Sequence, residues 1–125
     1  MTNDHQNNKL FRFLEWEVYQ NAQSTFVIVL KVVKKLSPDL RYTLGNQIIK
    51  SALSVILNIA EGSGRVTDKE MNRFFDIAIG STNETIAGLD SLVKTGFINK
   101  DEFNELFERY KSISRQLGGF KKKLS

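Results

Sequence analysis

The sequence predicts an all-α protein, an antiparallel up-down-up-down four-helix bundle. Apolar residues recur every three or four positions along most of the chain, which is the period of a helix and not of a strand. Four such segments are separated by short stretches that contain glycine, proline or helix-capping residues. The length of 125 residues suits one domain, and short connections place successive helices antiparallel.

The first two helices are expected over residues 17–36 and 41–61. One face of the first is apolar and consists of Val18, Ala22, Phe26, Val29, Val33 and Leu36. Pro38 suits the first turn of the next segment, so the first helix should end just before it. Gly62 is expected to end the second helix in the left-handed conformation.

The third helix begins at a capping box. Thr67 is placed to accept a hydrogen bond from the amide of Glu70, whose side chain reaches back. Val66 and Met71 occupy the two positions of a hydrophobic staple, and Gly96 should end the helix.

The fourth helix begins in the same way, with Asn99 as cap and Glu102 as its partner. Ile98 and Phe103 form the expected staple. Apolar residues then alternate in steps of three and four, which predicts a heptad seam in a bundle. The seam consists of Phe103, Leu106, Tyr110, Ile113, Leu117, Phe120 and Leu124.

The chain is expected to comprise a polar, partly disordered N-terminal tail (1–15) and a bundle domain (16–125). Residues 1–8 have neither a cationic start nor an apolar run, and no apolar run in the sequence approaches the 20 or so residues that span a membrane. A cytoplasmic protein without membrane contact is therefore expected. Cysteine is absent and His5 is the single histidine, so disulfides, zinc fingers and Ser-His-Asp chemistry are excluded, and no metal or cofactor is expected.

The second helix carries two apolar stripes, whereas a corner helix of a lone bundle needs one. The first stripe consists of Leu44, Ile48, Ala52, Val55 and Ile59, and the second of Ile49, Leu53, Ile56 and Ala60. The first helix shows a similar excess around residues 26–30. This surplus favours a homo-oligomer with interfaces on the first two helices. The alternative is a wide single-chain core, partly covered by residues 10–16.

A line of polar residues lies between those stripes: Gln47, Ser51, Ser54, Asn58 and Glu61. The third helix offers Ser81, Glu84 and the mid-helix glycines Gly80 and Gly88. A glycine inside a helix costs about 1 kcal/mol relative to alanine, which predicts close approach of two helices. Polar contacts between these helices, with Asn58 and Glu61 reaching Ser81 or Glu84, are the favoured interpretation. An acid–base or metal pair of Glu61 and Glu84 is the alternative, without the Glu-x-x-His motif of metal-binding bundles.

The net charge of +4 is compatible with a polyanionic partner. Arg65, Lys69 and Arg73 share a face at the start of the third helix, where cations oppose the helix dipole. With Arg41 and Lys50 they form the candidate nucleic-acid-binding set. A solvated basic surface is the alternative interpretation.

Two stretches resemble the 23S ribosomal RNA intervening-sequence family of bacterial four-helix-bundle proteins. They read Arg41-Tyr42-x-Leu44-x-x-Gln47-Ile48-x-Lys50-x-Ala52 and Asn58-Ile59-Ala60-Glu61-Gly62-x-Gly64-Arg65. Phe74-x-x-x-Ala78-x-Gly80-Ser81-x-x-Glu84 is similar to the third-helix signature of that family. The motif residues that carry the resemblance are Asn58, Glu61, Gly62 and Gly64.

The resemblance implies a ring, typically a homopentamer. It also implies kinship with the accessory variability determinant of diversity-generating retroelements, a basic pentameric barrel that binds nucleic acid and a reverse transcriptase. The expected partners are therefore further copies of this chain, RNA or DNA, and a reverse transcriptase or another protein. This chain departs from the family at Ile56-Leu57, where proline and a small residue are usual, and at Ile49-Lys50, where relatives often have two arginines.

Three functions follow as hypotheses. The first is a non-enzymatic, ring-forming bundle that binds nucleic acid or a ribonucleoprotein through a basic surface. The second is a protein-interaction scaffold without nucleic-acid binding. The third is a carboxylate enzyme that uses Glu61 and Glu84.

Overall fold

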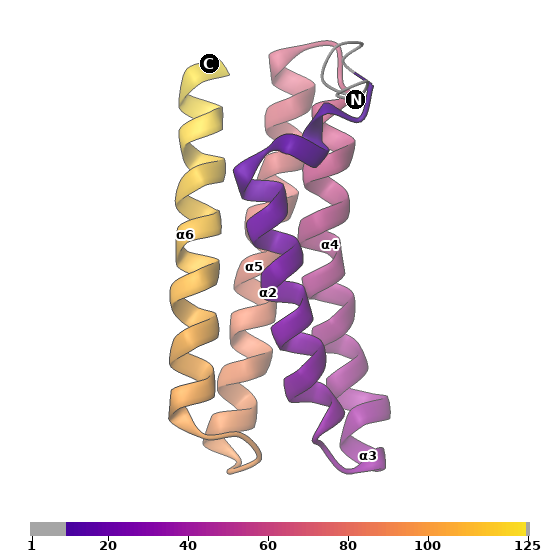
Figure 1. The fold of residues 1–125 in the computed structure, drawn as a ribbon, viewed down its shortest axis with the longest axis vertical. Helices are drawn as coiled ribbons and strands as arrows, with labels where there is room; N and C mark the ends of the chain where they lie inside the picture. The colour runs from indigo at the N-terminus through magenta and orange to yellow at the C-terminus, as the bar shows by residue number, and fades with distance from the viewer. Residues whose placement is uncertain (1–9, 125) are drawn as a thin grey trace.

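The structure, a computed structural model, confirms the four-helix bundle and describes residues 10–124, with the side chains of residues 10–121. Figure 1 shows the long helices lying side by side and alternating in direction along the chain. The elements are η1 (Arg12–Glu15), α2 (Glu17–Lys34), α3 (Pro38–Leu40), a π-helical turn η2 (Arg41–Gly45), α4 (Asn46–Ser63), α5 (Asp68–Lys94) and α6 (Lys100–Leu124). In the packing, α2 contacts α4 and α6, and α5 contacts the same two helices.

The core lies along the axis of the bundle and is built by the predicted apolar faces. Val29 of α2, Ile59 of α4 and Leu89 of α5 are fully buried. The heptad seam of α6 is confirmed at Leu106, Tyr110, Ile113 and Leu117, which are all buried, and the side chain of Leu124 lies outside the described part. The first stripe of α4 also faces the core, as does Ile56, which had been assigned to the second stripe.

Both predicted cap side chains accept the expected hydrogen bond, but among the described residues the reciprocal bond forms only at Asn99, and the staple at Val66 does not form. Asn99 Oδ1 accepts from the amide of Glu102 at 2.8 Å, and the amide of Asn99 donates to Glu102 Oε1 at 3.4 Å. Thr67 Oγ1 accepts from the amide of Glu70 at 3.2 Å. Val66, however, is 98% exposed, so the staple predicted with Met71 is wrong. Met71 packs into the core instead.

The prediction for Gly62 is also wrong, whereas that for Gly96 is confirmed. Gly96 has φ of 84° just after α5, the left-handed conformation that ends many helices. Gly62 lies inside α4, which continues to Ser63. A Cβ at Gly62 would lie 2.9 Å from Cε1 of Phe75. Glycine is therefore needed there for close packing against α5 and not for a special backbone angle.

The predicted tail falls partly outside the described residues, which begin at residue 10. Within it, η1 contacts both α2 and α4. Arg12 Nη2 donates to the backbone oxygen of Ser63 at 3.1 Å. Just after η1, the ring of Trp16 lies 4.9 Å from that of Phe120 on α6. Residues 12–16 thus pack over one end of the bundle (Figure 1). In the part of the chain described here, no helix is long and apolar enough to cross a membrane.

Candidate nucleic-acid interface

Three of the five candidate basic residues gather where α4 turns into α5. Arg65 follows α4, while Lys69 and Arg73 lie on successive turns of α5, and all three are exposed. Cζ of Arg65 and Cζ of Arg73 each lie 5.2 Å from the centre of the Phe74 ring. Two guanidinium groups therefore share one half-buried aromatic ring, which fixes their positions through cation–π contact.

The tight turn that brings these residues together depends on the sequence around Gly62. Its missing side chain leaves room for Phe75, and a Cβ there would also lie 3.2 Å from Cβ of Phe74. Gly64 follows directly as the C-cap of α4, and Thr67 caps α5 three residues later. The motif residues Gly62 and Gly64 thus serve the geometry of the turn.

The basic residues of this turn differ in how far nearby acids neutralise them. Arg65 forms an ion pair with Glu61, and its Nε also donates to the Glu61 backbone oxygen at 3.3 Å. Within residues 10–121, no carboxylate lies within 4.0 Å of the cationic groups of Lys69 and Arg73. These two cations are thus available to an external anion.

Arg41 and Lys50 lie elsewhere on the molecule. Lys50 lies thirteen residues before the end of α4, which corresponds to about 20 Å along a helix at 1.5 Å per residue, and Arg65 follows that end. Arg41 is in η2 near the opposite end of the bundle, with Cζ 5.9 Å from the centre of the Tyr42 ring. The five residues therefore do not form one continuous basic surface.

Arg41 borders an apolar groove between the outer sides of α2 and α4, with a volume of about 490 Å³. Its apolar lining includes Val27, Leu30 and Ile49, and its charged lining residues are Lys31, Lys34 and Arg41. Further along α4, Leu53 is 38% exposed and Leu57 is 55% exposed. We call the set Val27, Leu30, Ile49, Leu53 and Leu57 the outer apolar face.

The polar line of α4 contacts α5 through hydroxyl groups. Ser51 Oγ lies 2.7 Å from Thr85 Oγ1, and Ser54 Oγ lies 2.8 Å from Ser81 Oγ. Asn58 does not reach across as expected: its Nδ2 donates to the Ser54 backbone oxygen at 2.9 Å and to Ser54 Oγ at 3.0 Å. Asn58 thus supports the contact from within its own helix.

The two glutamates proposed as an acid–base or metal pair are not brought together. Glu61 pairs with Arg65, whereas Glu84 Oε2 accepts from Gln47 Nε2 at 3.1 Å. Gln47 and Glu61 are fourteen residues apart on α4, about 21 Å along the helix. The antiparallel register of α4 and α5 is the reason, since it sets Glu84 opposite the start of α4 and Glu61 near the start of α5. Among the described residues, no group of three or more His, Cys, Asp or Glu side chains could hold a metal ion.

Sequence reasoning did not identify Phe74 as the ring shared by two arginines. Its place directly after Arg73 was a visible signal in the sequence, but Arg65 reaches it only because of the tight turn. A second feature that was missed is the groove between α5 and α6, described below.

These observations define a class: an antiparallel four-helix bundle with a basic α4–α5 turn and an uncovered outer apolar face. The family model of the 23S rRNA-intervening sequence protein matches residues 15–119, so the chain belongs to that family. A crystal structure of a protein of unknown function from the S23 ribosomal protein family of Bacteroides thetaiotaomicron VPI-5482 has the same fold, with a TM-score of 0.74 at 22% identity. The match covers 80% of this chain and 94% of that one. No curated protein matches the chain.

Proposed function

We propose that this protein is a non-enzymatic, self-associating bundle that binds nucleic acid through the α4–α5 turn. The observation that carries the proposal is the placement of Arg65, Lys69 and Arg73 at the α4–α5 turn. Arg65 and Arg73 lie against the Phe74 ring, and Lys69 and Arg73 are outside any ion pair among residues 10–121. Arginine and lysine side chains in such a cluster bind phosphates without reading base sequence.

Self-association is supported by the outer apolar face. A contiguous apolar surface beside a groove commonly marks a protein interface. In a ring of five copies, which the family resemblance implies, the formal charge would be five times +4, or +20. Several weak phosphate contacts on one particle raise avidity without any strong motif. The proposal places the protein in the cytoplasm with its nucleic acid.

Arg41 and Lys50 take a different place in this proposal. Arg41 lines the α2–α4 groove, and Lys50 lies on α4 between Ile49 and Leu53. If copies associate through that face, the two cations lie at the margin of the interface. Arg41 and Lys50 contact the nucleic acid only if its strand runs from the α4–α5 turn across the margin of the interface.

The test is fluorescence anisotropy of a labelled 20-nucleotide RNA with the double variant Lys69→Gln/Arg73→Gln. We expect its affinity at 50 mM salt to fall at least tenfold. Loss of two phosphate contacts should lower the slope of log K against log salt by about 1.4 to 1.8 for each bound chain. Lys94→Gln is the matched control, because Lys94 lies on the same helix but already pairs with Asp90 at 3.0 Å. The proposal is wrong if the wild type does not bind at 50 mM salt, or binds equally at 50 and 200 mM.

A protein-interaction scaffold is the second candidate, and the outer apolar face favours it. In that case a partner protein, and not another copy, covers Leu53 and Leu57. The distinguishing result is one stoichiometric protein retained after nuclease treatment, together with no RNA affinity in the anisotropy measurement.

A further inference from the structure

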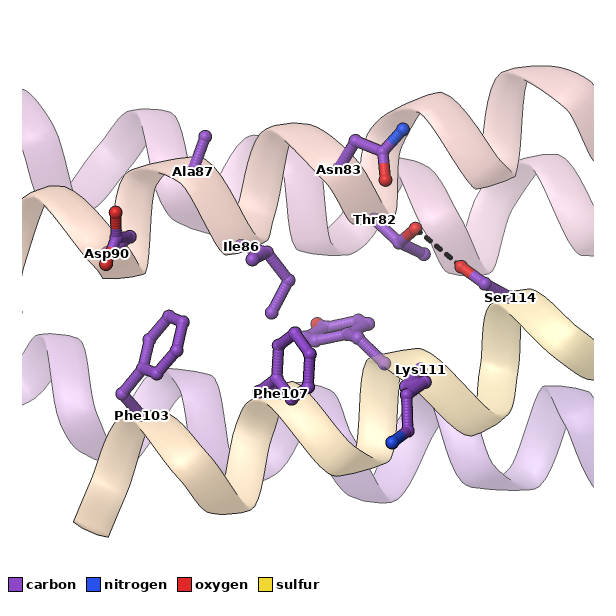
Figure 2. Close-up of a pocket in the computed structure, with 10 residues that line it drawn as sticks. Thr82, Asn83, Ile86, Ala87, Asp90, Phe103, Phe107, Lys111 and Ser114 are labelled. Carbon is purple, nitrogen blue, oxygen red and sulfur yellow. Dashed lines mark hydrogen bonds between the residues drawn. The ribbon is translucent and has the colours of Figure 1, made fainter. Parts of the chain in front are cut away.

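A groove with a volume of about 570 Å³ runs between α5 and α6. This volume lies within the range of about 300 to 1,000 Å³ that is usual for small-molecule sites. Figure 2 shows Phe103 and Phe107 side by side along α6, with Ile86 of α5 directed toward them. The two phenylalanine rings have centroids 6.0 Å apart and an interplanar angle of 27°, so they form a nearly parallel aromatic wall.

Tyr110 also lines this groove and supplies an unpaired polar group. Tyr110 is 2% exposed, and its hydroxyl oxygen has no hydrogen-bond partner in the described part of the protein. Buried polar groups are hydrogen-bonded in the great majority of native structures, since an unpaired one is destabilising. Burial also raises the pKa of the Tyr110 hydroxyl, so the group stays neutral and able to donate.

The neighbouring hydroxyls are already engaged with one another. Thr82 Oγ1 donates to the Ile79 backbone oxygen at 2.7 Å and lies 2.9 Å from Ser114 Oγ. This second contact is the dashed line in Figure 2. Thr82 and Ser114 therefore mark a polar end of the groove, and Tyr110 is part of the same lining.

The charged residues of the groove are also paired. Asp90 accepts from Lys94 at 3.0 Å, and Lys111 lies 3.2 Å from Glu108. Lys111 Nζ is also 5.6 Å from the centre of the Phe107 ring. With both charges neutralised by neighbours, the groove favours a neutral occupant over an ion.

We propose that the α5–α6 groove binds a small, neutral, planar aromatic molecule that carries one hydrogen-bonding group. Its ring packs in an offset manner against Phe103 and Phe107, at the separations of about 4.5 to 7 Å that aromatic pairs prefer. Its polar group bonds the Tyr110 hydroxyl. Phe107 is 39% exposed, and exposed side chains change rotamer within nanoseconds, so this part of the lining can adjust to an occupant.

This proposal is independent of nucleic-acid binding. Neither Lys69 nor Arg73 lines the groove, and the groove is apolar at its centre. A protein that fails to bind RNA would still bind the aromatic molecule, and the reverse holds as well.

The test is an NMR titration of ¹⁵N-labelled protein with 2-naphthol, a neutral planar aromatic compound with one hydroxyl. We expect saturable shifts at the amides of α5 and α6 that border the groove. Tyr110→Phe keeps the ring but removes the hydroxyl, and should weaken binding about three- to tenfold, the worth of one hydrogen bond. Phe107→Ala should weaken it at least tenfold. Phe97→Ala is the matched control, since Phe97 is 53% exposed and lies outside the groove.

Several results would overturn the proposal. These are the absence of saturable shifts at 1 mM 2-naphthol, shifts centred on the α2–α4 groove, or equal affinity of Phe107→Ala and Phe97→Ala. A wild type that loses its 2-naphthol affinity as the protein concentration rises would show that a second copy covers the groove. If Tyr110→Phe folds and binds as well as the wild type, the assigned hydrogen bond is wrong and the proposal fails with it.

Discussion

The two sides of α4 are both apolar in sequence but end in different environments. Toward α5, Ile48 packs into the space left by Gly88, and Ser51 and Ser54 pair with hydroxyls of α5. On the outer side, Leu53 and Leu57 remain 38% and 55% exposed. The chain thus closes one side with its own residues and leaves Leu53 and Leu57 on the other side exposed. On the closed side, the missing side chain of Gly88 is what lets Ile48 lie this close to α5.

Gly88→Ala is expected to have the largest effect on the closed side. The new Cβ would lie 2.6 Å from Cγ1 of Ile48, which is itself 2% exposed and has little room to move. Overpacking of this kind lowers the free energy of unfolding by about 1 to 3 kcal/mol. Urea unfolding followed by circular dichroism measures it.

Gly80→Ala is the matched control on the same helix. Nothing lies within 4 Å of a Cβ at this position, so alanine should raise the free energy of unfolding by about 0.5 to 1 kcal/mol through helix propensity. If Gly88→Ala raises the free energy of unfolding as Gly80→Ala does, α4 and α5 do not approach closely at Gly88.

The contact between α5 and α6 differs from both sides of α4, because Tyr110 of α6 is buried there and its hydroxyl has no hydrogen-bond partner among the described residues. Burial raises the pKa of this group above its ordinary value of 10.0. Below pH 10 both folded and unfolded chains hold the proton, and the associated stability is fully present. As the pH rises above 10 the unfolded chain loses the proton first, so the free energy of unfolding falls, by at most about 1.4 kcal/mol per pH unit.

Tyr110→Phe removes this titration and should lose less stability between pH 9 and 11 than the wild type. Urea unfolding of both proteins across that range measures the difference. Parallel pH profiles would show that the hydroxyl is not buried in the folded protein.

Thr85→Val is expected to cost about 1 kcal/mol, because it leaves Ser51 Oγ without its partner on α5. The loss is limited, since Ser51 Oγ still donates to the Ile48 backbone oxygen at 2.9 Å. Ser51→Ala should lower the free energy of unfolding less in the Thr85→Val variant than in the wild type. Strict additivity of the two free energies of unfolding would show that the hydroxyls do not interact.

Leu57→Glu should have the smallest effect on folding. The position is 55% exposed on the outer side of α4, so the monomer gains no buried charge, and its free energy of unfolding should change by at most about 0.5 kcal/mol. Thermal unfolding at a concentration low enough to prevent association measures it. A loss of several kcal/mol would place Leu57 in the core.

Much of the fold follows from local patterns in the sequence. The four helices, the caps at Thr67 and Asn99 and the left-handed Gly96 depend on spacing within a few residues, and sequence alone predicts them. The packing of Ile56 depends on how far α4 is rotated in the bundle, and local periodicity does not determine that rotation. For Gly62 the decisive neighbour is Phe75 on the next helix, so its role depended on a tertiary contact.

The candidate site was predictable only as a set of residue types. Arg65, Lys69 and Arg73 are close in sequence, and in the structure Arg65 and Arg73 lie against the same Phe74 ring. Arg41 and Lys50 were grouped with them by charge, but the length of α4 separates them from the turn. The charge of these residues can be read from the sequence, but the distance between them is known only from the structure.

Sedimentation velocity at micromolar concentration tests most directly whether the outer apolar face is covered by further copies of the chain. We expect the wild type to sediment as an oligomer and the variant Leu53→Glu/Leu57→Glu as a folded monomer. Lys100→Glu, an exposed change at the start of α6, should leave the oligomer intact. A wild-type species of 14.3 kDa, well folded and unassociated, would contradict the account.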